Sequence, residues 1–238
     1  MNLNNSIGVL RTSNSVLHLG GHLISARGIQ AGRMKEYAEI FTRINKSGTG
    51  LIVVTGGGDV AREYRDAAVE LGGSQVFRDE LGVMVTRINA HLLICALGER
   101  AYPAVPTSTQ QIREFASSGK IVVSGGLQPA QSTVAVSALA AESVGAEKLV
   151  LATDVEGVYS RDPKKYPDAR LLEEVTLKQL EKMILAQPQL PGEYELFDLL
   201  SVRILQRSKI PCSVVDGRVP SNLEKALTGK KVGTIIKP

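Results

Sequence analysis

The sequence predicts an α/β fold, a three-layer sandwich in which a mainly parallel central sheet is covered by helices on both faces. Strand-like and helix-like segments alternate throughout the chain after residue 14, and no linker or repeat divides them. The strand-like segments are continuously apolar, as in residues 51–54 (Leu-Ile-Val-Val). Such runs are typical of parallel strands that are buried on both faces. We expect a polar N-terminal extension at residues 1–14 and a single domain at residues 15–238.

The first half of the chain begins with an apolar strand at 16–19, which ends at two glycines. Tyr37, Ile40, Phe41 and Ile44 recur at i, i+3, i+4 and i+7, which predicts an amphipathic helix that ends near Gly48. Ser108 and Gln111 have the spacing of a capping box. The other expected elements are a strand at 51–54, a helix at 59–71 with Asp59 as its N-cap, a long apolar helix at 79–97, a strand at 101–105 and a helix that ends at 116.

In the second half, a strand at 121–123 leads through two glycines to a helix at 132–144. A strand at 148–152 and a long polar segment, 153–170, follow. Two further capping boxes, Thr176 with Gln179 and Ser221 with Glu224, predict helix starts. The remaining expected elements are a helix at 196–208 and strands at 210–215 and 233–236.

Three of the expected strands end in glycines, namely at Gly20-Gly21, Gly56-Gly57-Gly58 and Gly125-Gly126. Ligands of such sheets bind outside the carboxyl ends of the strands. Glycines let the backbone approach a ligand, and a helix N-terminus adds unpaired N–H donors that favour an anion. Arg62 lies one turn into the helix after the glycine triplet, where a guanidinium can hold a phosphate. The pattern predicts a phosphate-binding crevice.

Composition excludes several other classes of protein. The net charge is +4, and the basic residues are dispersed with few aromatics, so nucleic acid is not an expected partner. Cys95 and Cys212 lie far apart in apolar surroundings, as core residues of a reducing compartment do. The apolar stretch 81–97 is interrupted by polar residues, so no membrane partner is expected, and the N-terminus lacks the order of a signal peptide. We expect a cytoplasmic protein.

The common nucleotide-binding motifs are absent from the sequence, which limits the types of phosphate-binding site that it can form. The chain has no G-x-x-x-x-G-K-[ST] and no G-x-G-x-x-G, so neither a P-loop nor a standard dinucleotide site is supported. His18 and His22 flank the first glycine pair, but no carboxylate stands near them in the sequence, and we expect no protein-held metal.

Taken together, the motifs resemble the amino acid kinase superfamily, and within it the archaeal-type uridylate (UMP) kinases. The resemblance runs from about residue 16 to residue 238, in the family's order and spacing. The motifs that carry it are Thr55-Gly56-Gly57-Gly58 with Ala61-Arg62, Asp79-x-x-Gly82 with Thr86-Arg87-x-Asn89-Ala90, Gly125-Gly126-x-x-Pro129-x-x-Ser132-Thr133, Thr153-Asp154-Val155-x-Gly157-Val158-Tyr159-x-x-Asp162-Pro163, and Tyr194-Glu195-Leu196-x-Asp198 with Gln206-Arg207-Ser208-Lys209-Ile210. It implies the amino acid kinase (carbamate kinase-like) fold, with an acceptor-binding part at about 15–145 and an ATP-binding part at about 146–238.

The resemblance also implies roles for individual residues. Asp79 would accept hydrogen bonds from the ribose of UMP, or would otherwise serve only as a helix N-cap. The implied catalytic residues are His18, Gly20, Gly21 and Arg62. The implied UMP-binding residues are Gly57, Asp79, Leu127, Gln128, Pro129, Ala130, Gln131, Ser132 and Thr133. The implied ATP-binding residues are His18, Leu19, Gly20, Gly21, His22, Gly58, Arg62, Thr153, Tyr159 and Asp162.

The implied reaction is in-line transfer of the ATP γ-phosphoryl group to the UMP phosphate, in pyrimidine nucleotide biosynthesis. It needs positioning and charge neutralisation, with Mg²⁺ carried on ATP as cofactor. No general base is required, because the attacking phosphate oxygen is already ionised. The family further implies a homohexamer, with the helices at 34–46 and 79–97 as candidate interfaces, and feedback inhibition by UTP.

The chain departs from the wider superfamily at three positions. His18 stands where a lysine usually precedes the first glycine turn, Val134 replaces an acidic residue, and Ala130 replaces a glycine. A neutral histidine lacks the permanent charge of lysine, and we hypothesise that His18 instead hydrogen-bonds a phosphate oxygen.

Two alternatives remain open at this point. One is another acceptor on the same fold, such as isopentenyl phosphate, carbamate, acetylglutamate or aspartate, although Asp79 favours a ribose. The other is a non-catalytic nucleotide-binding or storage protein, which the small number of histidines disfavours, since the chain has three.

Overall fold

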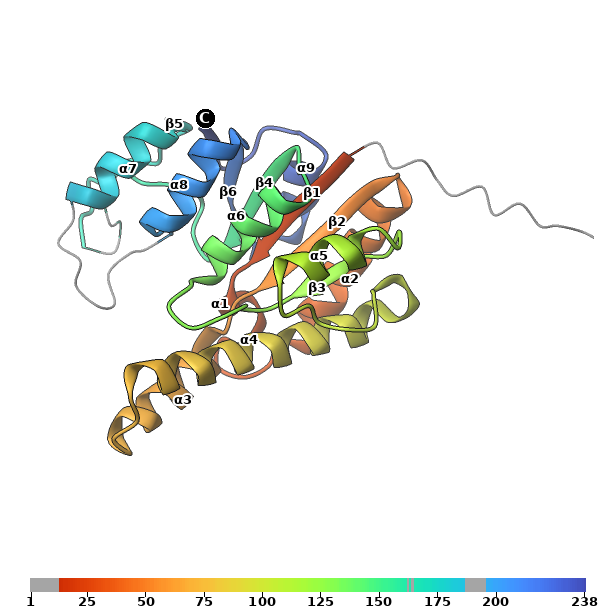
Figure 1. Cartoon of the computed structure of the whole chain (residues 1–238). Coiled ribbons are helices and arrows are strands. Elements are labelled where there is room, and N and C mark those ends of the chain that lie inside the picture. Colours follow the sequence, from red (N-terminus) through yellow and green to blue (C-terminus); the bar gives the residue numbers. More distant parts are fainter. Residues whose placement is uncertain (1–12, 162, 164, 187–195) are drawn as a thin grey trace, which may run out of the picture.

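The computed structural model describes residues 13–161, 163, 165–186 and 196–238. Its seven-stranded sheet has the order β3-β2-β1-β4-β6-β7-β5 (Figure 1). All neighbouring strands are parallel except β6 and β7. The strands are β1 (Ser13–Leu19), β2 (Thr49–Thr55), β3 (Val122–Ser124), β4 (Lys148–Thr153), β5 (Glu174–Thr176), β6 (Cys212–Asp216) and β7 (Thr234–Lys237). The mainly parallel α/β sheet predicted from the sequence is confirmed.

Helices cover both faces of this sheet (Figure 1). On one face α5 (Thr109–Ala116), α6 (Thr133–Ser143), α7 (Leu177–Ala186) and α8 (Leu199–Ser208) pack in one apolar core. On the other face α1 (Gly21–Ile24), α2 (Ala31–Lys46), α4 (Gln75–Leu97) and α9 (Pro220–Leu227) pack in a second core. Alternate residues of β1 divide between the two, since Val16 belongs to the first core, and Leu17 and Leu19 to the second. The three-layer arrangement is therefore built from strands that are apolar on both sides.

Helix α3 (Gly58–Glu70) leaves the carboxyl end of β2 and packs against α4 and α1. Helix α4 then runs back past the carboxyl ends of β1 and β2 toward β3 (Figure 1). This placement leaves the glycine turns, the start of α3 and the first turns of α4 at one edge of the sheet.

Several element boundaries differ from those expected. Strand β1 begins at Ser13, because Ser13 and Asn14 pair with the start of β2, and residues 1–12 lie outside the described part of the chain. Residues 101–105 form only an isolated bridge, from Ala101 to Ile121. Strand β5 was missed, since it is three residues long, too short for a pattern. The division into acceptor-binding and ATP-binding parts stays a prediction.

Some of the predicted helix caps are confirmed and others are wrong. Ser108 and Thr176 accept hydrogen bonds from the N–H groups of Gln111 and Gln179, as the capping boxes predicted. The cap prediction for Asp59 was wrong, because α3 begins one residue earlier, after Gly57, and Asp59 lies in its first turn.

The capping box at Ser221 was also wrong. Pro220 occupies the first turn of α9, and Glu224 pairs instead with Arg43 of α2. A favourable ion pair with another element thus replaces the local motif.

Candidate functional site

The first two glycine turns contact each other directly. Gly20 donates its N–H to Ala152 O and Gly56 donates to Leu19 O, both at 2.9 Å. A Cβ on Gly21 would lie 1.9 Å from Gly58 N, and Gly58 has φ of +66°. The approach leaves no room for a side chain at Gly21, and glycine adopts the positive φ of Gly58 more readily than other residues. The N-termini of α1 and α3 therefore meet at the carboxyl edge of β1 and β2.

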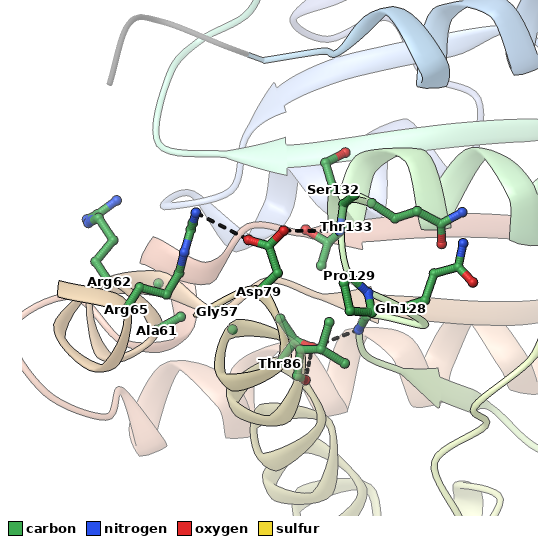
Figure 2. Close-up of a pocket in the computed structure, with 16 residues that line it drawn as sticks. Gly57, Ala61, Arg62, Arg65, Asp79, Thr86, Gln128, Pro129, Ser132 and Thr133 are labelled. Atoms are coloured by element: carbon green, nitrogen blue, oxygen red, sulfur yellow. Dashed lines mark hydrogen bonds and ion pairs between the residues drawn. The ribbon is translucent and has the colours of Figure 1, made fainter. Parts of the chain in front are cut away.

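A pocket of about 380 Å³ opens beside these turns, between α3, α4 and the segment that leads into α6 (Figure 2). Its walls come from three stretches of chain that are far apart in the sequence. The lining residues are Gly57, Gly58, Ala61, Arg62, Arg65, Asp79, Gly82, Val83, Thr86, Gly126, Gln128, Pro129, Ala130, Gln131, Ser132 and Thr133.

Helix α4 holds both rims of this pocket through its Thr86-Arg87-x-Asn89 motif. The Thr86 hydroxyl accepts from Gly126 N at 2.7 Å, and Arg87 donates to the carbonyl oxygens of Gly126 and Leu127 at 3.0 and 2.8 Å. Asn89 is buried and donates its side-chain amide to Gly56 O at 2.8 Å. The motif therefore fixes the glycine turn after β2 and the turn after β3 relative to each other.

Asp79 faces the pocket from the second turn of α4. Ser74 caps that helix, accepting from Phe77 N at 3.2 Å, so the N-cap alternative for Asp79 was wrong. The Oδ2 atom of Asp79 accepts from Ala130 N at 3.2 Å, and its Oδ1 lies 3.6 Å from the guanidinium of Arg65. Ala130 adopts φ of +60° at this contact, in the left-handed region that glycine adopts more readily than alanine.

Arg62 projects at the start of α3, where it contacts Asp59 and His22. Its guanidinium forms an ion pair with the Asp59 carboxylate and lies 2.9 Å from His22 Nε2. The backbone N–H of Arg27 lowers the pKa of Asp59, and the positive charge of Arg62 lowers it further. Asp59 therefore stays ionised and holds the guanidinium beside the glycine turns.

His18 is buried at the carboxyl end of β1, with its Nε2 3.0 Å from the Thr133 hydroxyl. Burial lowers the pKa of its imidazole to about 4, so the ring is neutral at physiological pH. The Nδ1 atom is buried and has no hydrogen-bond partner in the part of the chain that the structure describes. His18 therefore supplies no positive charge, and its ring holds Thr133 at the start of α6.

The N-termini of α6 and α8 also meet beside the pocket. Ser132 caps α6 by accepting from Ala135 N at 2.9 Å, and its hydroxyl donates to the carboxylate of Asp198. Asp198 in turn caps α8, accepting from Ser201 N at 2.8 Å. Asp198 thus contacts the lining residue Ser132, a role that its position in the sequence did not indicate.

Among the expected ATP-binding residues, those at 18–22 lie at the end of β1, Gly58 and Arg62 lie at the start of α3 after β2, and Thr153 lies at the end of β4. Thr153 is the last residue of β4 and its carbonyl accepts from Gly217 N at 2.8 Å. The Tyr159 hydroxyl donates to Glu156 at 2.9 Å. The Leu19 side chain is fully buried in the second core, which leaves only its backbone for a ligand. Asp162 lies outside the described residues.

Most of the expected UMP-binding residues line the pocket. Leu127 is the exception, because its side chain packs against the first core while its carbonyl holds Arg87. The sequence analysis assigned no site role to five other lining residues, Ala61, Arg65, Gly82, Val83 and Thr86. A signal for Arg65 existed, since it follows Arg62 by three residues and therefore shares its helix face.

A family sequence model, named relatives and a crystal structure all relate this chain to the same group of proteins. Residues 15–216 match the sequence model of the Amino acid kinase family. The chain is 44% identical over 205 residues to a uridylate kinase of Hyperthermus butylicus, covering 86% of this chain and 90% of the relative. It is 44% identical to a uridylate kinase of Methanoculleus marisnigri, covering 93% and 94%. The crystal structure of uridylate kinase from Archaeoglobus fulgidus superposes with a TM-score of 0.84 at 37% identity, over 93% and 99% of the two chains.

Proposed function

This chain belongs to the amino acid kinase family, and we propose that it is a uridylate kinase that transfers the γ-phosphoryl group of ATP to UMP, giving UDP and ADP. The observation that carries this proposal is the pocket of Figure 2, in which two helix N-termini and a carboxylate face one cavity. The relatives named uridylate kinase cover nearly the whole chain.

The pocket has matching chemistry for a nucleoside monophosphate. Gly57 and Gly58 begin α3, and Ser132 and Thr133 begin α6, so two helix N-termini, whose first N–H groups have no partner within the helix, lie where a phosphate would bind. Asp79 lines the same pocket from α4, and a carboxylate accepts hydrogen bonds from two neighbouring hydroxyls. A phosphate at the helix N-termini and a ribose at Asp79 therefore account for both ends of the pocket.

The residues of the chain act by positioning and by charge. Arg62, steadied by Asp59, stands at the start of α3 and would neutralise charge on the transferred group. His18 orients the Thr133 hydroxyl, so its role in this proposal is to position a ligand-binding group and not to contact a phosphate. The acceptor phosphate is already ionised, so no side chain has to remove a proton.

ATP would bind over the ends of β1 and β4, with its phosphates at the first glycine turn and its adenosine near Tyr159. In this proposal the metal ion is carried by the phosphate oxygens of ATP and not by a cluster of protein side chains. Mg²⁺ bound to ATP would neutralise the negative charge of the phosphates during transfer.

Asp79 also bears on the alternative acceptors. Isopentenyl phosphate has no hydroxyl pair for a carboxylate, and an apolar tail beside the Asp79–Arg65 ion pair would leave those charges without hydrogen bonds from the ligand. The pocket chemistry thus favours UMP over this acceptor.

We further propose a homohexamer in the cytoplasm, subject to feedback inhibition by UTP. The apolar face of α2 is buried in the second core and is not available to a partner. Helix α4 differs, because it exposes Phe77, Met84, Ile88 and Leu92 at helical spacing. By length and composition alone Gln75–Arg100 is apolar enough to cross a membrane, but the packing of α4 on α2, α3 and β3 favours a helix of the folded domain.

An acceptor comparison tests the proposed reaction. ADP release is measured with Mg²⁺ and ATP, and with UMP, CMP, dUMP or isopentenyl phosphate at equal concentration. We expect the highest kcat/KM with UMP. Higher kcat/KM with isopentenyl phosphate would establish the alternative acceptor, and ATP binding without turnover of any acceptor would favour a binding protein.

A further inference from the structure

Arg65 is a second cation in the pocket wall, one helical turn after Arg62. The two arginines make different contacts. Arg62 pairs with Asp59, which is not part of the pocket lining, whereas Arg65 pairs with Asp79 (Figure 2). Arg65 therefore belongs to the Asp79 end of the pocket, away from the glycine turn between β1 and α1.

Asp79 is held by groups from both of its sides. Its Oδ1 lies 3.6 Å from the Arg65 guanidinium and accepts from the Gln75 amide at 3.4 Å. Its Oδ2 accepts from Ala130 N at 3.2 Å. Each carboxylate oxygen can accept two hydrogen bonds, so Oδ2 retains capacity for a ligand. The pairing at Oδ1 thus sets the direction in which the other oxygen faces.

The aliphatic part of the Arg65 side chain packs on α4 at Gly82, three residues after Asp79. A Cβ at Gly82 would lie 3.5 Å from Arg65 Cδ, at ordinary van der Waals distance. The stem therefore runs close along the backbone of α4, and this path brings the guanidinium to Asp79. Arg65 is half-exposed, with its side chain 47% accessible, so it can respond to a ligand without disturbing the core.

We propose that Arg65 is a positioning residue that holds the Asp79 carboxylate in the orientation that receives the ribose hydroxyls of the acceptor nucleotide. This inference rests on the proposed UMP kinase function. Arg65 also offsets the negative charge of Asp79, which would otherwise repel the phosphate of the same nucleotide. Both effects act on acceptor binding and leave ATP binding and phosphoryl transfer unchanged.

The Arg65→Ala variant tests this role. We expect the KM for UMP to rise about three- to fivefold, the scale of an exposed ion pair, with kcat and the KM for ATP unchanged. The preference for UMP over dUMP should fall, since dUMP lacks one hydroxyl, and Arg65→Lys should restore part of the loss. The matched control is Arg203→Ala, which removes an exposed ion pair with Glu181 at 3.3 Å between α8 and α7.

A double-mutant cycle with Asp79→Asn separates positioning from direct contact. If Arg65 acts through Asp79, Arg65→Ala has no further effect on UMP binding in the Asp79→Asn background. An unchanged KM in the single variant, or a full effect that persists without the Asp79 charge, would overturn the proposal. Calorimetric titration with UMP accompanies each assay, so that a wild type without turnover counts against the kinase function, while UMP affinity still decides the role of Arg65.

Discussion

His18 shows how the neighbours of a residue decide its chemistry. From the sequence it stands in the place of a lysine, and contact with a phosphate was the natural hypothesis. The structure buries its ring and places Nε2 on Thr133, so the imidazole is neutral and already has a partner. The sequence identified the position, whereas its hydrogen-bond partner depends on α6, which lies 115 residues away.

Burial of His18 predicts a pH dependence of stability. Its pKa is about 4 in the folded state and 6.5 in the reference state, so the unfolded chain binds more protons between these values. Its contribution to the free energy of unfolding is therefore complete above pH 6.5 and is lost as the pH falls toward about 4. The slope can approach about 1.4 kcal/mol per pH unit.

Urea unfolding of wild type and His18→Leu, above and within this pH window, measures the effect. We expect the wild type to lose more stability than the variant as the pH falls. A difference between the two proteins that stays constant with pH would contradict the account.

At the scale of elements, strand ends and helix starts were largely predictable, because apolar runs, glycines and capping residues are local signals. The three glycine turns come from adjacent strands and two of them touch, as a parallel sheet requires. The role of Thr86-Arg87-x-Asn89 was not predictable, because its partners are backbone atoms of two other elements. The short strand β5 and the Arg43–Glu224 ion pair were not predicted for the same reason, since both depend on contacts between elements that are far apart in the sequence.

The contact between the first two glycine turns predicts that Gly21 does not tolerate a side chain. Gly21→Ala would force its Cβ against the backbone of Gly58, and we expect a loss of about 2–3 kcal/mol in the free energy of unfolding together with weaker nucleotide binding. The matched control is Gly32→Ala near the start of α2, where an added Cβ meets no atom within 4 Å. That variant should be neutral or stabilising by up to about 1 kcal/mol.

Urea unfolding and calorimetric titration with UMP would measure both variants. Equal stabilities for Gly21→Ala and Gly32→Ala would show that the two turns do not pack as described.

At the scale of the whole molecule, the sequence predicted that the site would lie at the carboxyl edge of the sheet. It predicted the loop at 127–133 and Asp79 as parts of one site, and all of these except Leu127 line a common pocket. Arg65 belongs to none of the family motifs, and its spacing from Arg62 places it on the same helix face without showing that it lies 3.6 Å from Asp79. Which apolar helix faces are exposed was likewise decided by packing, which buries the face of α2 and exposes that of α4.

The apolar side chains exposed on α4 are the proposed interface between subunits, and a substitution there tests it. Ile88 is 58% exposed near the middle of this face, and Ile88→Glu should shift the protein to smaller species in sedimentation velocity, because a charge would be buried in the proposed interface. Leu185→Glu on α7, where leucine is 60% exposed, is the control and should leave the assembly unchanged. A monomeric wild type, or an Ile88→Glu protein that sediments like wild type, would contradict the proposed interface.

The most direct test of the central claim is to follow the γ-phosphoryl group itself. The protein is incubated with Mg²⁺, UMP and ATP labelled at the γ-phosphate, and the labelled products are separated. The account predicts that the label appears in UDP, in amounts equal to the ADP released, and that Asp79→Asn slows this transfer at low UMP concentration. Label found only in inorganic phosphate, or retained in ATP while UMP is bound, would contradict the assignment of this pocket to UMP phosphorylation.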